Sequence, residues 1–509
     1  MKGYHVMKKS IAFVLALLAI MTAFVGCANV DDTPDPADTT VSDGGTQGVK
    51  PDSSSPMDTT YGNYDENGYI KDNIPDDESL EGETVTFLYW EDAPNTEFFA
   101  EDQNGESIND AIYFRNMTIE ERLKVKLAFV PSVGKYEEQA TFINKAQTDI
   151  TSGVCEYDVL AAYSMTIAST AYNGMAVDLS QFDTLSFDMP WWPDTLLQES
   201  TIYDKLYFAS GDISTNMLYM MYCCFFNKKQ LEDNGLEDPY TLVDNNEWTL
   251  DKMIEMSANI YQDNNGDQIV NAEDIFAFST GSTVHLDPFY YGSGLRTMEK
   301  NADGTPTISP DFSSERAVDV VNKVRAYLND GNYAYYKDDD IFVEGRSLFT
   351  YERVQIASKS LKEVDFEFGI VPVPKYNSDQ ENYSTVLGFP YTLYCISAGS
   401  KKADAAALTL ECMASESYRQ ITPVLFEESM KFKYASDNKT AQMYDILRET
   451  VSFDIGRIFT MSFDKITYQY FRNSVSSAGA SDYSSAVKAK VRVLERLVEN
   501  FSETFADMD

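Results

Sequence analysis

An alternation of strand-like and helix-like segments near the start of the folded region constrains the fold more than any other feature. Residues 84–90, 124–131 and 157–163 are apolar runs of strand length, rich in β-branched and aromatic residues. Residues 106–123 and 136–153 lie between them and carry apolar side chains at helical spacing. This order predicts a parallel α/β sheet, in which ligands bind beyond the carboxyl ends of the strands.

The remainder of the chain continues the α/β pattern with less regularity. Strand-like runs at 366–375 and 388–398 flank a polar loop, and the apolar run at 216–235 predicts a strand that turns into a helix. Amphipathic segments predict further helices at 248–262, 313–331, 401–415 and 485–501. About 425 residues follow residue 83, which favours two or more lobes over a single core.

Charge and histidine content exclude several classes of function. The chain has 81 Asp and Glu against 40 Lys and Arg, and this net charge of −41 would repel nucleic acid and anionic lipid headgroups. Its two histidines are His5, near the N-terminus, and His285. A zinc site with several His ligands is therefore excluded, and a Ser-His-Asp triad would depend on His285 alone.

The N-terminus has the features of an export signal. Lys8 and Lys9 precede an apolar run at 11–25, which is short for a membrane-spanning helix and suited to a signal peptide. The run ends in "FVGC", where Gly26 and Cys27 resemble a bacterial lipobox. This resemblance implies that residues 1–27 are a lipoprotein signal peptide and that Cys27 is lipidated, anchoring the protein to the extracytoplasmic face of the membrane. Ordinary signal cleavage beside an unmodified cysteine is the alternative.

Residues 28–82 have the composition of a disordered tether. They are rich in Asp, Thr, Pro, Gly and Ser and poor in apolar residues. Such a segment cannot bury enough apolar surface to offset the entropy lost on folding. We expect it to hold the folded part at a distance from the membrane.

The segment "DNNGDQIVNAED", residues 263–274, has nearly the ligand spacing of an EF-hand calcium loop. Gln268 stands where the turn requires Gly, and the last position is Asp instead of the usual Glu. The motif occurs once, so it indicates a structural Ca²⁺ on a surface loop and not a sensor; a metal-free turn held by Asx hydrogen bonds is the alternative. The ligands would be Asp263, Asn265, Asp267, the carbonyl of Ile269, Asn271 and Asp274.

Six pieces of the sequence, in order, resemble one protein family. They are the lipobox with its tether, "TVTFLYW", "INKAQTDITSGVCEYDVL", "CCFFNKKQLEDNGLEDPYTL" with "EWTLDKM", "FVEGRSLF" and "FGIVPVPK". Together they resemble the extracellular solute-binding proteins of ABC importers, in the family 1 branch of oligosaccharide binders. The resemblance covers nearly all of residues 83–509, although "WW" at 191–192 and the long C-terminal region depart from it.

The resemblance implies a two-lobed, type II periplasmic-binding-protein fold with a hinge and extra C-terminal helices. Lobe 1 would comprise 83–218 and 388–430, and lobe 2 would comprise 219–387 and 431–509. A monomer of this kind closes on a small solute, here a carbohydrate, and delivers it to an ABC permease without a required cofactor or enzymatic activity.

Aromatic side chains at strand ends and in loops are the candidate ligand-binding residues, because sugars stack on aromatic faces while carboxylates and amides bind their hydroxyls. Trp90, Glu91, Asp92 and Tyr163 lie at the ends of predicted strands, and Trp191 and Trp192 lie in a proline-flanked loop. Packing in the core is the alternative role. It is the favoured role for the remaining candidates, which are Tyr219, Phe289, Tyr290, Tyr351 and Tyr391.

Two other functions fit parts of the sequence. An exported glycoside hydrolase needs only two carboxylates and no histidine, and a calcium-dependent adhesion or scaffold protein would use the loop at 263–274. No nucleophile elbow, P-loop or H-E-x-x-H motif is present. The fold separates these functions: two lobes with a cleft lined by Trp90 and Tyr163 favour the binding protein, and a barrel with paired carboxylates favours the hydrolase.

Overall fold

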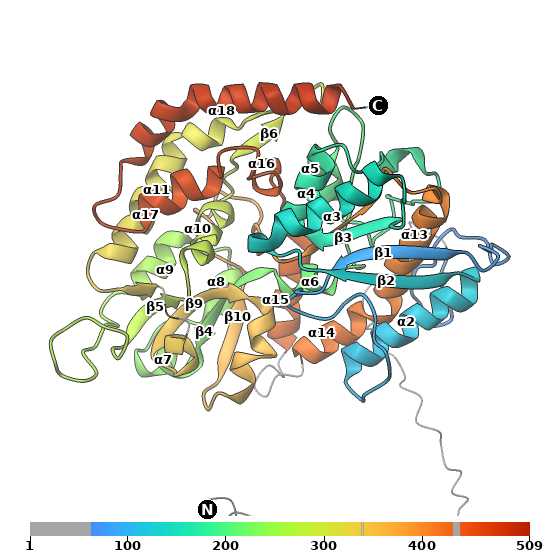
Figure 1. Ribbon diagram of the computed structural model, residues 1–509. Helices are drawn as coiled ribbons and strands as arrows, with labels where there is room; N and C mark the ends of the chain where they lie inside the picture. The colour runs from blue at the N-terminus through green and yellow to red at the C-terminus, as the bar shows by residue number, and fades with distance from the viewer. Residues whose placement is uncertain (1–62, 337, 339, 431–437, 509) are drawn as a thin grey trace, which may run out of the picture. The chain divides into compact units, whose positions relative to one another are not determined.

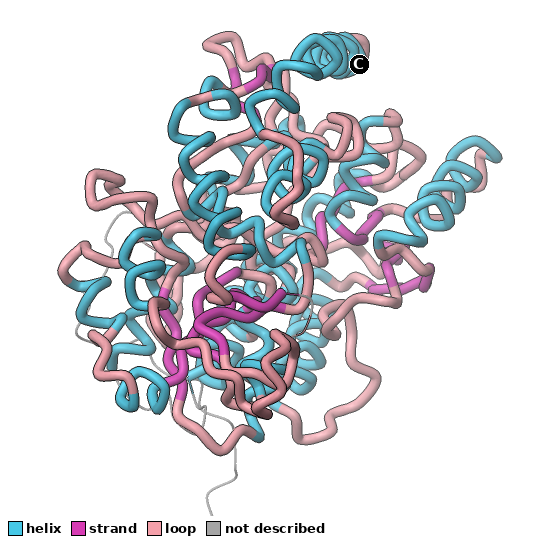
Figure 2. The backbone as a smooth tube through the Cα atoms, turned by 90° about the vertical axis from the view of Figure 1, so that its left-hand side faces the viewer, coloured by secondary structure: helices cyan, strands magenta, loops and turns pink. Residues whose placement is uncertain are grey.

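The structure, a computed structural model, describes residues 63–508 except 337, 339 and 431–437 (Figure 1). The predicted signal peptide, its Cys27 and the tether up to residue 62 lie outside the described residues. Helices lie on either side of the strands (Figure 2). None of the helices in this described part is both long enough and apolar enough to cross a membrane.

The alternation at the start of the folded region forms the first of two main sheets, in the order β11-β3-β1-β2. Strand β1 (Thr84–Trp90) pairs in parallel with β2 (Lys126–Ser132) and β3 (Val159–Tyr163), and β11 (Thr392–Ile396) runs antiparallel to β3. The predicted parallel α/β sheet is confirmed, with one antiparallel edge strand from far along the chain. The associated helices are α2 (Ser107–Leu123), α3 (Gln139–Ser152), α4 (Ser164–Tyr172), α5 (Asp194–Ser200), α6 (Thr215–Tyr219), α13 (Ala403–Gln420) and α14 (Thr422–Met430).

The second sheet has the order β10-β4-β9-β5-β8. Its strands are β4 (Tyr222–Asn227), β5 (Phe276–Thr280), β8 (Ala334–Tyr336), β9 (Ser347–Arg353) and β10 (Phe368–Val371). Strand β5 is parallel to β8 and β9, whereas β4 is antiparallel to β9 and β10. The remaining elements are α7 (Lys228–Asp233), α8 (Pro239–Asp244), α9 (Leu250–Met256), α10 (Asp287–Gly292), the hairpin β6 (Met298–Lys300) and β7 (Pro306–Ile308), α11 (Glu315–Asn329), α12 (Asp340–Val343), α15 (Asn438–Glu449), α16 (Ile455–Ile458), α17 (Asn473–Val475) and α18 (Tyr483–Ala506).

The chain passes between the two sheets repeatedly. It leaves the first sheet after β3, builds the second from β4 to β10, and returns with β11. The expected lobe boundaries near residues 218 and 388 fall in these two connections. Two separate sheets joined by several connections are the arrangement that permits hinge motion around a ligand.

The last helix, α18, contacts elements of both sheets, although we expected the region after residue 431 to belong to the second lobe alone. Near its start, the Tyr483 hydroxyl donates to the carbonyl of Phe312, which precedes α11. Near its end, the ring of Phe501 stacks on Tyr172 of α4, with ring centroids 5.6 Å apart. Helix α18 therefore spans parts of the chain that belong to different sheets (Figure 1).

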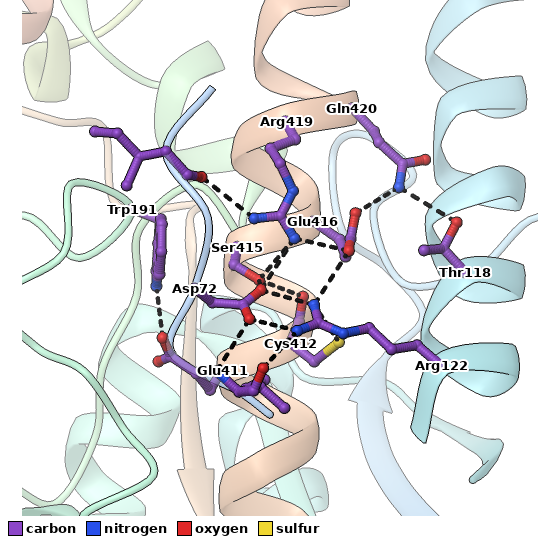
Figure 3. Close-up of polar contacts among 12 residues, drawn as sticks. Asp72, Thr118, Arg122, Trp191, Glu411, Cys412, Ser415, Glu416, Arg419 and Gln420 are labelled. Carbon is purple, nitrogen blue, oxygen red and sulfur yellow. Dashed lines mark hydrogen bonds and ion pairs between the residues drawn. The ribbon is translucent and has the colours of Figure 1, made fainter. Parts of the chain in front are cut away.

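The segment at 64–82 differs from the predicted tether because it packs against the first sheet and its helices. Ile70 and Ile74 are buried in the main core, and Asp72 is almost fully buried. The Asp72 carboxylate lies 2.5 Å from Arg122 of α2 and 3.0 Å from Arg419 of α13, and it accepts a hydrogen bond from Ser415 (Figure 3). Composition alone does not reveal this anchoring, because the two arginines come from helices far along the chain.

Candidate ligand-binding site

A cavity of ≈ 440 Å³ is lined by residues that belong to the first sheet or adjoin one of the two sheets, and by residues of the C-terminal region. This volume lies within the range of small-molecule sites. The first sheet's region contributes Tyr136, Tyr163 and Met165, the second contributes Val284, the connection before β11 contributes Phe389, and the C-terminal region contributes Thr460, Met461, Lys465, Thr467, Tyr468 and Arg472. Because the lining comes from segments around both sheets, hinge motion between the sheets would bring the walls of the cavity together.

The strand ends of the first sheet deliver two of its tyrosines to the cavity. Tyr163 is the last residue of β3, so it stands at the carboxyl edge of the parallel strands, where ligands of such sheets bind. Tyr136 begins a short 3₁₀ turn after the carboxyl end of β2. Among the strand-end candidates named from the sequence, Tyr163 is the one that lines the cavity.

Asp92 and Gly134 shape the loop that carries Tyr136. The Asp92 carboxylate accepts hydrogen bonds from the backbone N–H groups of Gly134, at 2.9 Å, and Lys135, at 3.3 Å. A Cβ on Gly134 would lie 2.8 Å from the Cβ of Trp90, so a larger residue would push the loop outward. Asp92 is placed to support the site through this loop, and it does not line the cavity.

Trp90 lies behind Tyr163 and not on the cavity surface. Its side chain is only 1% exposed, and its indole N–H donates to the hydroxyl of Thr392 at 2.8 Å. The ring meets Tyr163 edge-on, with centroids 5.7 Å apart. Trp90 therefore packs against the back of the tyrosine that lines the cavity, whereas Glu91 is exposed and lies outside the lining.

The adjacent tryptophans Trp191 and Trp192 both turn into the core. Their indole N–H groups donate to the two oxygens of Glu411 on α13, at 3.1 Å and 2.9 Å, and Figure 3 shows the first of these bonds. Burial raises the pKa of Glu411 to about 7, although the Trp192 and Trp191 donors oppose this shift. A buried carboxylate that satisfies both indoles is the physical reason for two neighbouring buried tryptophans.

The five remaining aromatic candidates are buried and lie outside the cavity lining. They are Tyr219, Phe289, Tyr290, Tyr351 and Tyr391. The rings of Phe289 and Tyr351 pack 4.5 Å apart in the core of the second sheet, and Tyr290 donates its hydroxyl to the carbonyl of Arg296. Their placement fits the packing role favoured above.

A buried ionic cluster lies beside the cavity. Asp287, at the start of α10, accepts two hydrogen bonds from Arg472, both at 2.6 Å, and another from Arg457. Burial alone would raise the pKa of Asp287, but the two guanidinium groups hold it below its ordinary value. Arg457 also lies 3.8 Å above the ring of Phe389, and both Phe389 and Arg472 line the cavity.

The C-terminal segment supplies six of the eleven lining residues, and none of them was singled out from the sequence. Asp464 and Lys465 both adopt left-handed backbone conformations, with φ of 53° and 52°. They precede a π-helical turn over Thr467–Arg472. Both features are uncommon and concentrate at functional sites, but neither has a signal in composition or hydrophobic periodicity.

The loop at 263–274 uses its acidic groups to bind its own backbone. The two oxygens of Asp263 accept from the N–H groups of Gly266 and Gln268, at 2.7 and 2.8 Å, and Asp274 accepts from Asn271 and the Tyr261 hydroxyl. Asp267 similarly accepts from Ile269, and Asn265 from Asp267.

Gln268 has φ of 61°, the left-handed conformation that the Gly of a calcium loop would adopt. Within the described residues, no group of three or more His, Cys, Asp or Glu side chains is arranged to hold a metal. None of the loop's residues lines the cavity. Calcium binding by this loop stays a prediction.

Several solved structures resemble the fold of this chain. No curated protein sequence matches the chain. Similar structures include a cyclic α-maltosyl-1,6-maltose binding protein from Arthrobacter globiformis, which is 16% identical, covers 82% of this chain and 99% of its own, and gives a TM-score of 0.56. UgpB from Mycobacterium tuberculosis, in complex with glycerophosphocholine, is 15% identical, with coverage of 81% and 98% and a TM-score of 0.54. An ABC substrate-binding protein from Listeria monocytogenes, in complex with cycloalternan, is 14% identical, with coverage of 84% and 99% and a TM-score of 0.51.

These structures share the two-lobed binding-protein fold with this chain, which confirms the expected architecture. The sequence model of one family, described as bacterial extracellular solute-binding protein, matches residues 120–420, which is more than half of the chain. The chain therefore belongs to the family of bacterial extracellular solute-binding proteins.

Proposed function

We propose that the protein captures a carbohydrate-containing solute in the ≈ 440 Å³ cavity and delivers it to the permease of an ABC importer. The observation that carries the proposal is the cavity itself, whose lining combines three tyrosines with residues that adjoin both sheets. The sugar-binding titles of the similar structures from Arthrobacter globiformis and Listeria monocytogenes support the ligand class. We also propose that the protein is a monomer. Lipidation of Cys27 would hold it on the extracytoplasmic face of the membrane, close to the permease.

The tyrosines are suited to hold a solute during capture. Tyr136 and Tyr468 are 41% and 44% exposed, so their rings are accessible, whereas Tyr163 is packed against Trp90 and forms a fixed wall. Aromatic rings present apolar faces together with a hydroxyl, a combination that suits the apolar and polar sides of a sugar. A solute that contacts residues from both sheets would stabilise the closed arrangement by its differential affinity.

The hydrolase alternative gains no support from this cavity. Glycoside hydrolases place two carboxyl groups on either side of the scissile bond. None of the eleven described lining residues is Asp or Glu, and the strands form two open sheets instead of a barrel. We therefore propose binding and transport as the function.

Replacing both Tyr136 and Tyr468 with Ala is expected to weaken solute binding by about fivefold to a hundredfold, because each ring contributes roughly 0.5–1.5 kcal/mol. The measurement is the rise in melting temperature with a panel of neutral linear and cyclic oligosaccharides, since a ligand that binds only the folded state stabilises it by mass action. Folding should be unaffected because both side chains are exposed.

Phe114→Ala is the matched control, because Phe114 is a 42% exposed aromatic residue on α2 that does not line the cavity. The assignment of the cavity would be contradicted by an oligosaccharide that raises the melting temperature of the double variant as much as that of the unaltered protein. If no neutral oligosaccharide raises the melting temperature of the unaltered protein, a neutral sugar is contradicted as the ligand.

A further inference from the structure

The cavity has the opposite charge character to the rest of the molecule. The chain carries 81 acidic residues against 40 basic ones, but the cavity lining contains two cations, Lys465 and Arg472, and no carboxylate among the described residues. It also contains no Asn or Gln, so both the carboxylates and the amides that commonly bind sugar hydroxyls are missing from this lining. A binding site for a wholly neutral sugar does not require this charge pattern.

The buried cluster next to the cavity contains two guanidinium groups that form ion pairs with one carboxylate. Arg457 and Arg472 share the single carboxylate of Asp287. Arg457 uses its second terminal nitrogen to donate to the carbonyl of Leu387 at 2.7 Å. Arg472 uses Nε and Nη2 on Asp287, and its Nη1 has no hydrogen-bond partner in the part of the chain that the structure describes. A guanidinium group with an unused N–H in a site shielded from water favours the arrival of an anion.

Two buried carboxylates near the cluster are engaged by other groups. Asp454 accepts hydrogen bonds from the backbone N–H and the hydroxyl of Thr297 and from the backbone N–H of Arg457, and its side chain forms no ion pair with Arg457 or Arg472 among the described residues. Glu352 lies 2.7 Å from Arg353 Nε and 2.9 Å from His285 Nδ1. Burial would raise the pKa of Glu352, but His285 and Arg353 lower it to about 2, so this carboxylate is ionised and already paired. At the rim, Glu137 and Asp464 are near Tyr136 and Lys465 in sequence, but neither lines the cavity. Solvent-exposed charges at the edge of the cavity are screened by salt more strongly than charges inside it.

Two further groups in the lining are free to bind a polar ligand. The Thr460 hydroxyl is buried, with its residue only 4% exposed, and it has no hydrogen-bond partner among the described residues. A buried hydroxyl without a partner is costly, and Thr460 belongs to the cavity lining, so a polar ligand in the cavity is a candidate partner for this hydroxyl. Lys465 donates to the Tyr136 hydroxyl at 3.1 Å and forms no ion pair within the described residues, so its charge is also available.

We propose that the solute carries an anionic group, a carboxylate or a phosphate, which binds at Arg472, Lys465 and Thr460 while the rest of the solute contacts the tyrosines. The inference rests on the proposed function and narrows its ligand to acidic or phosphorylated carbohydrates. An arginine that presents a free N–H beside a lysine matches an oxyanion, and charge-assisted hydrogen bonds are about twice as strong as neutral ones.

The test compares solutes with and without an anionic group. Digalacturonate is measured against its neutral methyl ester, and trehalose 6-phosphate against trehalose, by isothermal titration calorimetry on the full folded chain. The first pair probes a carboxylate and the second a phosphate. We expect the anionic member of at least one pair to bind about tenfold or more tightly than its neutral partner.

Two variants locate the anion without disturbing the buried cluster. Lys465→Gln removes an exposed charge, and Thr460→Val removes the hydroxyl while keeping the side-chain shape. Both should lower the affinity for the anionic member several-fold and leave the neutral member unchanged. Lys488→Gln on α18 is the control, since Lys488 is exposed and does not line the cavity, and it should change neither affinity.

Equal or weaker binding of the anionic member in both pairs would overturn the inference, as would failure of every anionic member to bind. The inference would also be overturned if Lys465→Gln and Thr460→Val lowered the affinities for the anionic and the neutral member to the same extent. If the neutral oligosaccharides nevertheless bind and depend on Tyr136 and Tyr468, the proposed function stands and only the anionic ligand class is wrong. If neither set binds, both are contradicted.

Discussion

Asp287→Ala is expected to lower the free energy of unfolding by about 3–5 kcal/mol, because within the described residues Asp287 is the one carboxylate that forms ion pairs with two buried guanidinium groups. Asp287 is fully buried, and Arg457 and Arg472 are both largely buried. The three residues also join α10, beside the second sheet, to α16 and the π-helical turn of the C-terminal segment. Loss of the carboxylate should therefore loosen the segment that supplies most of the cavity lining.

Urea unfolding followed by circular dichroism measures this effect. Asp379→Ala is the matched control, because Asp379 is an exposed acidic residue in a loop between β10 and β11. Surface substitutions of this kind usually change stability by less than about 0.5 kcal/mol. Equal free energies of unfolding for the two variants would show that the ion pairs of Asp287 contribute little to the folded state. They would also contradict the view that these ion pairs fix the C-terminal segment beside the cavity.

Asp72→Ala is expected to lower the free energy of unfolding by about 1–3 kcal/mol, because a buried carboxylate that accepts charge-assisted hydrogen bonds is lost while Glu416 still pairs with both of its arginine partners. The variant would leave Arg122 and Arg419 without the carboxylate that lies between α2 and α13 (Figure 3). The segment at 64–82 would lose its main polar anchor, and the burial of Ile70 and Ile74 would weaken with it. Asp76→Ala is the control, since Asp76 is exposed in the same segment.

The contribution of Asp72 should also depend on pH. Burial raises its pKa, but the hydrogen bonds and charges of Arg122, Ser415 and Arg419 outweigh this and hold the pKa below the ordinary value. The unfolded state therefore binds the proton more readily, so the stabilisation is present above the ordinary Asp pKa of about 3.9 and is lost as pH falls through the lower folded-state pKa. The stability difference between the unaltered protein and Asp72→Ala should shrink under acid conditions; a constant difference from pH 7 to pH 3 would contradict the assigned ionisation.

Local sequence patterns were sufficient to predict the first sheet. The predicted strand at 84–90 coincides with β1, and those at 124–131 and 157–163 overlap β2 and β3. Tyr163 could be placed at the binding edge because the carboxyl ends of parallel strands meet at one edge of a sheet. These features depend on residues close in sequence, whose spacing encodes which face is buried.

The parts that escaped prediction depend on partners far along the chain. Trp191 and Trp192 turn inward because Glu411 receives their N–H groups, and Asp72 is ordered by arginines in two distant helices. Lys465 and Arg472 reach the cavity through an irregular C-terminal segment that follows no strand or helix period. Charged residues in such a segment look like ordinary surface residues until the fold brings them to the site.

The central claim is that solute binds in the cavity between elements of the two sheets, and a crystal structure of the protein loaded with the tightest-binding solute of the panels tests it most directly. We expect the solute to contact Tyr163 on one side and the C-terminal segment, including Arg472, on the other. A second cavity, of ≈ 600 Å³, is lined by residues that include Asp212, Met217 and Arg448. Solute bound there, or on the surface, with the Tyr163 cavity empty would contradict the claim.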